Sequence, residues 1–462
     1  MDTLTHRFAR FVAGCGWDRL RQDTVAYQKI LLLDFLGVAL FASRGARIKR
    51  VARMFENLGG IEESTALVGG RMPAPYAAYV NSMLAHGTDW DDSHLAAVVH
   101  PGAVVLPAVL AVGEHVQATG RQIIAAAVAG YEVIIRLGRA IQPQHMLQGF
   151  HGTATCGVFG SAAASARLLG LDAPTTASAL GLAASSASGL GQFFQSGSSV
   201  KSFQVAKSAH DGIMAALLAA SGVDAPDDAL EGEKGFFRAY APGTPRADPL
   251  HGLGAGDSVL EVMIKRYPIA AHLHGAVDAA MSLAGEAAGE LDDIRQIDVL
   301  IDPAIAGNNN ELRPRDLQAA RMSLPFCIAC TLWANAARPE AKRWLDPADL
   351  ERGLLDDGVR SLTQRVRCRS WPGAAVDDVG SSLRSRVIIH ADGRSIGREA
   401  APRWGWQGER TAEEAVEKFS RLTAYVLDAG TRAVFLEAVL RFEEAGAASG
   451  LLQILRAATA PH

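Results

Sequence analysis

The sequence is poor in aromatic residues, in cysteine and in excess charge of either sign. Aromatic side chains make up 6% of its 462 residues, and the formal net charge is −4 at pH 7. No block of Lys and Arg could follow a phosphate backbone, so we do not expect a nucleic acid as a partner. The five cysteines are odd in number and scattered, which argues against a disulfide framework and favours a reducing, cytoplasmic location.

Long hydrophobic runs are also missing. The most apolar early stretch, residues 30–42, contains Asp34 and is shorter than the ~20 residues that cross a bilayer. We therefore expect a buried helix there and no association with a membrane. The N-terminus lacks the apolar core of a signal peptide, and the chain has no Walker loop, GxSxG elbow or HExxH motif.

The chain does contain enough hydrophobic material for a large core. Hydrophobic residues make up 49% and charged residues 20%, and the length allows roughly two or three domains. In the first half, apolar residues recur at helical spacing. The predicted helices are residues 123–141, 156–169, 175–190 and 206–220, with Asp172 and Pro174 as a start signal before the third.

The pattern changes after about residue 265. Residues 294–301 and 365–370 alternate polar and apolar side chains, which predicts strands. Residues 386–396 predict a hairpin, because Asp392-Gly393 stands between two alternating runs. Helical patterns occupy residues 275–288, residues 317–336 and the chain after residue 411.

The strands are thus confined to one segment with helices on both sides. We predict a mainly α fold with a large all-helical domain formed by residues 1–265 together with residues 402–462. A smaller α+β domain, residues 266–401, is inserted into it.

The densest polar cluster runs from His86 to His100. It holds three carboxylates and three imidazoles within fifteen residues. Acidic groups this close repel one another, so some must be hydrogen-bonded, solvated or shifted in pKa. The cluster is typical of the edge of a catalytic site with a general acid or base; a hard-metal site and a capped loop between two helices are the alternatives.

Three further segments could carry chemistry. Residues 149–155 place His151 before a helix of small residues. The N-terminus of this helix could bind a carboxylate; the alternative is a helix cap with a surface histidine. Lys201 follows a Gly/Ser stretch within residues 195–210 and could pair with a substrate carboxylate, although a loop lysine is often only solvated. Lys265 and Arg266, with His272 and His274, fall at the predicted domain boundary, where pockets often form; a basic surface turn is the alternative.

Cys327 and Cys330 form a CxxC pair. No second pair accompanies them, and they lie in an apolar helical run. Buried core is therefore expected rather than zinc binding or redox chemistry.

Taken in order, these segments resemble the MmgE/PrpD family, which includes 2-methylcitrate dehydratases, cis-aconitate decarboxylases and iminodisuccinate epimerase. The matching stretches lie between about residues 81 and 330. They are AHGTDWDDSH, HPGAVVLPAVLAVGE, AGYEVIIRLGRA, GFHGTATCGVFGSAAASARLLGLD, ALGLAASSASGL, KRYPIAAHLHGAVDAA and MSLPFCIAC. The resemblance implies a helical domain with a smaller α+β lid domain, a homodimer, and an active site without a metal or organic cofactor.

The resemblance to the decarboxylase branch also implies roles for particular residues. It carries over Asp89, His100, His151 and Lys201, together with Ser93, where a Thr is common, and Met146 as a pocket residue. Two positions depart from the pattern: Ala270 stands where a His is expected, and Phe326 where a Tyr is common. His272 and His274 lie close enough in sequence to substitute for the missing His.

The expected function is proton transfer at a carbon α to a carboxylate, on a small di- or tricarboxylate. We expect Lys201, Lys265 and Arg266 to bind substrate carboxylates, while His100 or His151 moves the proton. Asp89 would orient a histidine and tune its pKa. A dehydratase-type lyase is the leading hypothesis, with an epimerase or a cis-aconitate-type decarboxylase as alternatives.

Two other classes stay open at this point. One is a metal-dependent hydrolase that uses His86, Asp89, Asp91 and His94. The other is a helical scaffold or binding protein without catalysis, against which the clustered His, Asp and Lys residues argue.

Overall fold

The computed structural model describes residues 2–193, 198–243, 247–255, 257–287, 291–340, 343–372, 384–391, 393–403, 405–446 and 450–451. Its contacts divide the chain into two compact units. The first unit comprises residues 1–191, 200–264 and 405–462, and the second comprises residues 192–199 and 265–404.

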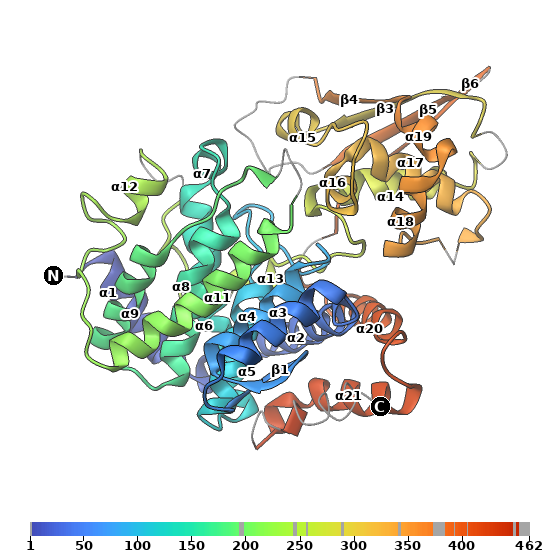
Figure 1. The fold of residues 1–462 in the computed structure, drawn as a ribbon. Helices are drawn as coiled ribbons and strands as arrows, with labels where there is room; N and C mark the ends of the chain where they lie inside the picture. Colours follow the sequence, from blue (N-terminus) through green and yellow to red (C-terminus); the bar gives the residue numbers. More distant parts are fainter. Residues whose placement is uncertain are drawn as a thin grey trace. The chain divides into compact units, whose positions relative to one another are not determined.

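The first unit is built mainly of helices that come from both ends of the chain (Figure 1). In chain order they are α1 (Leu4–Gly14), α2 (Gln22–Ala42), α3 (Ala46–Leu58), α4 (Ala74–His86), α5 (Gly102–His115), α6 (Gly120–Ile141), α7 (Gln144–Leu147), α8 (Gly152–Leu168), α9 (Ala173–Ser186), α11 (Val200–Ala220), α12 (Phe236–Tyr240), α13 (Asp257–Leu260), α20 (Glu409–Thr423) and α21 (Ala429–Leu440).

Small side chains let these helices pack closely. Helix α8 packs against both α6 and α11, and an added Cβ on Gly130 would come within 2.7 Å of the carbonyl oxygen of Gly160. On Gly212 it would come within 2.4 Å of the Ser161 Cβ. The abundant Ala and Gly residues therefore serve close helix packing.

Helix α2 is largely buried within the first unit. It is the one described helix that is long and apolar enough to cross a membrane, but 72% of its apolar window is buried inside the protein. Its Asp34 is paired with Lys418 of α20, and α20 packs beside α2 although the two are far apart in sequence (Figure 1). The prediction of a buried helix over residues 30–42 is confirmed.

One part of the first unit is not helical. Strands β1 (Ser64–Ala66) and β2 (Gly70–Met72) pair antiparallel, so the prediction of an all-helical domain is wrong in this detail. The turn between them has Gly69 and Gly70 at φ values of +100° and +97°, which glycine adopts at little steric cost. Strands of three residues are too short to give a readable alternation.

The second unit has helices beside a four-stranded sheet in the order β4-β3-β5-β6. The strands are β3 (Ile294–Ile301), β4 (Val366–Ser370), β5 (Ser385–Ala391) and β6 (Arg394–Ala400). Strand β4 runs parallel to β3, whereas β5 is antiparallel to both β3 and β6. The helical segments are η2 (Ala271–Leu273), α14 (His274–Leu283), α15 (Pro303–Asn308), α16 (Leu317–Met322), α17 (Leu324–Asn335), α18 (Pro347–Leu355) and α19 (Asp357–Thr363).

Most predicted elements are confirmed, with shifted ends. The two single strands and the hairpin lie where expected, although Asp392 of the predicted turn is outside the described residues. The helix predicted over residues 317–336 is in fact two helices, because Ser323 caps α17 by accepting a hydrogen bond from the Phe326 N–H and Pro325 favours a helix start. Cys327 and Cys330 are buried in α17, as predicted.

Candidate active site

The loop between α4 and α5, residues 87–101, carries most of the candidate site residues. Asp89 and Val98 in this loop have φ values of +56° and +51°. Such values are uncommon for residues other than glycine, and for a β-branched residue they are a clear outlier. A backbone held in this region requires support from its surroundings, and such strain often accompanies a functional site.

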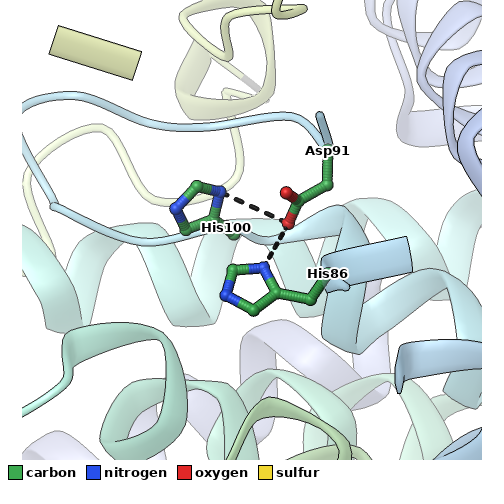
Figure 2. A group of neighbouring side chains, drawn as sticks. All are labelled: His86, Asp91 and His100. Carbon is green, nitrogen blue, oxygen red and sulfur yellow. Dashed lines mark hydrogen bonds and ion pairs between the residues drawn. The ribbon is translucent and has the colours of Figure 1, made fainter. Parts of the chain in front are cut away.

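Asp91 lies between two imidazoles at the centre of the site (Figure 2). Its Oδ2 is 2.6 Å from Nδ1 of His86 and 3.3 Å from Nδ1 of His100. Burial alone would raise the pKa of Asp91, but the imidazoles and their hydrogen bonds hold it well below its ordinary value. The carboxylate is therefore ionised at neutral pH and accepts hydrogen bonds from both rings.

The protonated nitrogen of His100 can be identified from its partners. Nδ1 lies 2.8 Å from the carbonyl oxygen of Asp92, and a carbonyl oxygen can only accept. Nδ1 therefore carries the hydrogen, and in the neutral ring Nε2 carries the lone pair. The His100 side chain is 14% exposed, compared with 0% for His86, which makes its Nε2 the more accessible basic nitrogen.

His86 has the same tautomer but stays neutral. Burial lowers the pKa of His86 to about 4, against the attraction of Asp91. Its Nδ1 donates to Asp91, and its buried Nε2 has no hydrogen-bond partner among the described residues. The ring packs edge to face against His100, with centroids 4.8 Å apart.

A third imidazole belongs to His151, the residue at the N-cap position of α8, whose side chain makes no capping hydrogen bond. The amide nitrogen of Gln204 donates to the carbonyl oxygen of Leu190 at 3.0 Å, so its amide oxygen faces Nδ1 of His151 at 2.9 Å. His151 thus donates from Nδ1 and also carries its lone pair on Nε2. Burial, together with the nearby His86 and Lys201, lowers its pKa well below the ordinary value.

Lys201 brings a buried ammonium group to the site. It lies in the first turn of α11 rather than in a loop, is 5% exposed, and its Nζ is 2.9 Å from Oδ1 of Asp89. The solvated-lysine alternative is therefore wrong. The positive charge of Lys201 contributes to the lowered pKa of both His86 and His151.

Asp92 has a different environment from its neighbour Asp91. Its carboxyl accepts hydrogen bonds from the backbone N–H of Gly102 at 2.8 Å and from the Tyr131 hydroxyl at 2.7 Å. Burial raises the pKa of Asp92 to about 7, with a further contribution from Asp91. Asp92 thus anchors the start of α5 and adds little negative charge below neutral pH.

The rest of the loop is tied down by backbone bonds. Ser93 forms a two-way bridge with Met263, at 2.9 and 2.7 Å. The His94 ring accepts from the Ala97 N–H at 3.1 Å, which leaves its Nε2–H to face Glu261 at 3.2 Å. His94 is therefore structural, and Ser93 contributes its backbone here.

The sequence predicts Asp89 as the carboxylate that orients a histidine, and this role stays a prediction. The structure places Asp91 against the histidines and Asp89 against Lys201. Asp91 and His86 were named only as ligands in the metal alternative, and Gln204 was not singled out. The HGTDWDD letters show which groups are present, but the direction of each side chain depends on the φ value at Asp89, which the letters do not give.

The group His86, Asp91 and His100 could in principle hold a metal ion, since one donor atom from each lies within 4.8 Å of the others. Two ligands on one tetrahedral zinc ion, each ~2.0–2.1 Å from it, lie about 3.4 Å apart. The 2.6 Å between His86 and Asp91 is instead a hydrogen-bond distance. The proposed ligands Asp89 and His94 contact Lys201 and Glu261.

The other predicted binding residues have varied surroundings. Met146 is half-buried in α7 of the first unit. Lys265, Arg266, His272 and His274 belong to the second unit; of these, Lys265 is fully buried. Part of the segment 195–210, residues 195–197, is outside the described residues.

Within the second unit, three of these side chains have specific partners. Arg266 pairs with Asp278 at 3.0 Å, and His272 lies 3.0 Å from the side-chain oxygen of Asn309. His274 accepts from the Tyr267 N–H at 3.2 Å, and its Nδ1 lies 3.3 Å from the Ala270 carbonyl oxygen. Both ring nitrogens of His274 thus bond the backbone, so the suggestion that it replaces the missing His is corrected to a structural role.

A mainly helical protein that places two imidazoles, His86 and His100, on one ionised carboxylate, with a third imidazole, His151, close by, is suited to acid–base chemistry. Comparison with known proteins agrees with this class. The MmgE/PrpD N-terminal domain matches residues 6–248, and the MmgE/PrpD C-terminal domain matches residues 267–444. The chain therefore belongs to the MmgE/PrpD family.

Named relatives match over almost the whole chain. A cis-aconitate decarboxylase of Aspergillus terreus is 28% identical, with 98% of this chain and 96% of the relative covered. The human cis-aconitate decarboxylase is 26% identical over 100% of this chain and 96% of its own. The cis-aconitate decarboxylase-like protein oryM of Aspergillus oryzae is 27% identical, with 96% of each covered. These relatives support an enzyme of this family.

Proposed function

We propose that this protein is a lyase that acts on a small di- or tricarboxylate and moves a proton at the carbon α to a carboxylate. The observation that carries the proposal is the setting of His100. Its Nδ1–H is bonded to the Asp92 carbonyl and faces the Asp91 carboxylate. Its Nε2 is therefore a base whose protonated form is stabilised by a fixed negative charge.

The steps follow from these contacts. Nε2 of His100 takes the proton from the substrate carbon, and Asp91 stabilises the imidazolium that results. The developing enediolate charge requires a nearby cation in a dry site, and the buried Lys201 ammonium supplies one. His86 and His151 stay neutral, because burial lowers the pKa of each ring, and each carries its lone pair on Nε2.

The same groups serve more than one reaction. In a dehydratase, proton removal by His100 is followed by loss of a hydroxyl group. In a decarboxylase, no C–H proton is removed first, so His100 must enter the step protonated, donates that proton to the carbanion that remains after CO2 leaves, and takes up another from water. The dehydratase is the leading hypothesis from the sequence, whereas the relatives, which are cis-aconitate decarboxylases, favour cis-aconitate as the first substrate to test. An epimerase would need a second base, for which His151 is the candidate.

Proton NMR in D2O tests the proposal directly. The enzyme is added to methylcitrate, cis-aconitate and iminodisuccinate in turn. With methylcitrate, loss of water across the methyl-bearing carbon leaves a double bond without a hydrogen on it, so replacement of the methyl doublet by the singlet of a methyl group on an alkene supports dehydration. Loss of cis-aconitate to a dicarboxylate with one carbon fewer supports decarboxylation. Loss of an α C–H signal without a new alkene supports epimerisation, and no change with any acid contradicts the proposed substrate class.

The role of His100 is tested by His100→Asn. We expect turnover to fall by at least ~100-fold, because general acid–base catalysis typically contributes that much. His94→Asn changes a ring in the same loop that bonds Ala97 and faces Glu261, and serves as the control for folding. A His100→Asn variant with near-normal turnover would remove this residue from the mechanism.

The cytoplasmic location, the homodimer, the lid role of the second unit and the substrate-binding roles of Lys265, Arg266 and His272 remain predictions. The binding role proposed for Met146 is of the same kind.

A further inference from the structure

A second buried ammonium group contacts the site loop from the far end of the sequence. Lys418 in α20 places its Nζ 2.8 Å from the backbone carbonyl oxygen of Trp90, which is 328 residues away in the chain. The same Nζ lies 2.6 Å from Oδ1 of Asp34 in α2 and 5.7 Å from the centre of the Trp90 ring. The side chains of Lys418 and Asp34 are 3% and 1% exposed.

Stability alone does not explain this arrangement. Taking two charges out of water costs nearly as much as their attraction returns, so an apolar pair of similar volume often stabilises a core equally well. What an apolar pair cannot do is donate a hydrogen bond to a backbone carbonyl. The distinctive contribution of Lys418 is therefore its bond to Trp90.

Trp90 stands between the two aspartates that matter most. Its carbonyl belongs to the peptide group that joins it to Asp91, so fixing that oxygen limits the orientation of the Asp91 Cα. On its other side Asp89 has a φ of +56°, a conformation that persists only when its surroundings impose it. A single donor at this point acts on Asp91, which faces two imidazoles, and on Asp89, which faces Lys201.

We propose that Lys418 is a positioning residue, which fixes the Trp90 carbonyl and thereby holds Asp91 against His86 and His100. The C-terminal helix α20 is then a structural part of the active site although it contributes no reacting group. The effect of Lys418 on kcat rests on the proposed function, whereas its effect on the hydrogen bonds of the His86 and His100 rings does not.

The test compares three variants. Lys418→Met leaves Asp34 buried without its cation, so it lowers the stability of the protein and also removes the donor that fixes the Trp90 carbonyl. The double variant Asp34→Leu/Lys418→Met replaces the ion pair by an apolar pair and isolates the loss of the donor to Trp90. Lys29→Met is the matched control. Lys29 lies on α2, as Asp34 does, and its ammonium group likewise bonds a carboxylate and a backbone carbonyl, those of Glu443 at 2.6 Å and Leu440 at 2.7 Å. Neither partner belongs to the site loop.

Two measurements are made on each variant. Nitrogen-15 spectra of histidine-labelled protein show which ring nitrogen of His86 and His100 carries the proton, and kcat and KM are measured on any substrate found. For the double variant we expect a urea midpoint near that of the wild type, altered His86 and His100 signals, and a kcat lower by at least ~10-fold, since small displacements in a site can cost more than that. Lys29→Met should keep the wild-type signals and kcat.

Other results overturn the inference. Wild-type histidine signals in the double variant would show that Lys418 does not position Asp91, and an equal loss in Lys29→Met would show a general effect of loosening α2. Failure of the double variant to fold would make the ion pair structural and likewise refute the positioning role. If no acid is turned over, the proposed function fails, while the histidine spectra still decide the role of Lys418.

Discussion

Replacing Asp91 by Asn removes the negative charge that the two imidazoles share. The amide oxygen of Asn can still accept one ring N–H, but it no longer offsets the charge of an imidazolium. His100 should therefore resist protonation during the reaction, while its position changes little. The perturbation separates charge from geometry at the centre of the site.

The magnitude can be worked from the distance. Unit charges 3.3 Å apart, at an effective dielectric constant of about 20, interact by about 5 kcal/mol. If about half of the proton is transferred in the transition state, about 2.5 kcal/mol of that stabilisation is felt, which corresponds to a fall in kcat of about 70-fold. The side chains are 3% and 14% exposed, so solvent weakens this only modestly.

The assay is the initial rate of substrate loss by NMR, with kcat and KM separated. Asp298→Asn is the control, because Asp298 in β3 of the second unit also faces an imidazole, with its Oδ2 3.0 Å from Nε2 of His390. We expect kcat to fall in Asp91→Asn and to stay unchanged in the control. A kcat within a factor of about three of the wild type, in folded Asp91→Asn, would refute the charge argument, since it leaves less than about 1 kcal/mol of the expected ~2.5 kcal/mol in the transition state.

Two further predictions concern protonation and metals. Asp92→Asn should alter the pH dependence of the free energy of unfolding. The pKa of Asp92 in the folded protein is about 7, above the ordinary 3.8, so the protonated carboxyl stabilises the folded state at low pH. Up to about 4 kcal/mol of this stabilisation is lost as the pH rises from about 4 to 7. Urea unfolding across this range should show the variant gaining stability relative to the wild type as pH rises; a parallel pair of curves would contradict the assigned cause. Prolonged chelation should leave turnover unchanged, because the 2.6 Å contact between His86 and Asp91 is a hydrogen bond rather than a ligand spacing; loss of activity that zinc restores would reverse this conclusion.

The sequence predicts the long elements well because their periodicity is strong. Helix α6 and strand β3 begin and end close to the predicted residues. The break at Ser323 and the hairpin of β1 and β2 were missed, since a single cap and two strands of three residues leave little trace in a periodic pattern. At Ser323 a side-chain hydrogen bond starts a new helix, and at β1 and β2 the strands are too short for the periodic pattern to show them.

The site was predicted in composition but not in pairing. His100, His151, Asp89 and Lys201 do lie within one unit near one another. Two contacts in the site could not be derived, those of His151 with Gln204 and of Asp92 with Tyr131, because Gln204 and Tyr131 lie on α11 and α6 and reach the site only through tertiary packing. Lys418 is farther still in sequence, so no local motif could have pointed to it.

The loop shows how one short run of acidic residues obtains three different electrostatic roles. Asp89 faces an ammonium group, Asp91 faces two imidazoles, and Asp92 accepts from a hydroxyl and a backbone N–H. Neighbouring carboxyl groups with separated pKa values indicate an acid–base site, and here the pKa of Asp91 lies well below the ordinary value while that of Asp92 is about 7.

The charges of these groups place a requirement on substrate binding. Asp89 and Lys201 offset each other, and His86 and His151 are neutral at pH 7, so Asp91 leaves the cluster with an excess negative charge that a proton on His100 neutralises. That balance favours proton transfer to His100, but it gives no net attraction for a substrate with two or three carboxylates. The carboxylates of such a substrate would need further cationic side chains, and this role of Lys265 and Arg266 stays a prediction. Neutralising either one should raise KM more than it lowers kcat, because a carboxylate remote from the reacting carbon keeps its charge throughout the reaction.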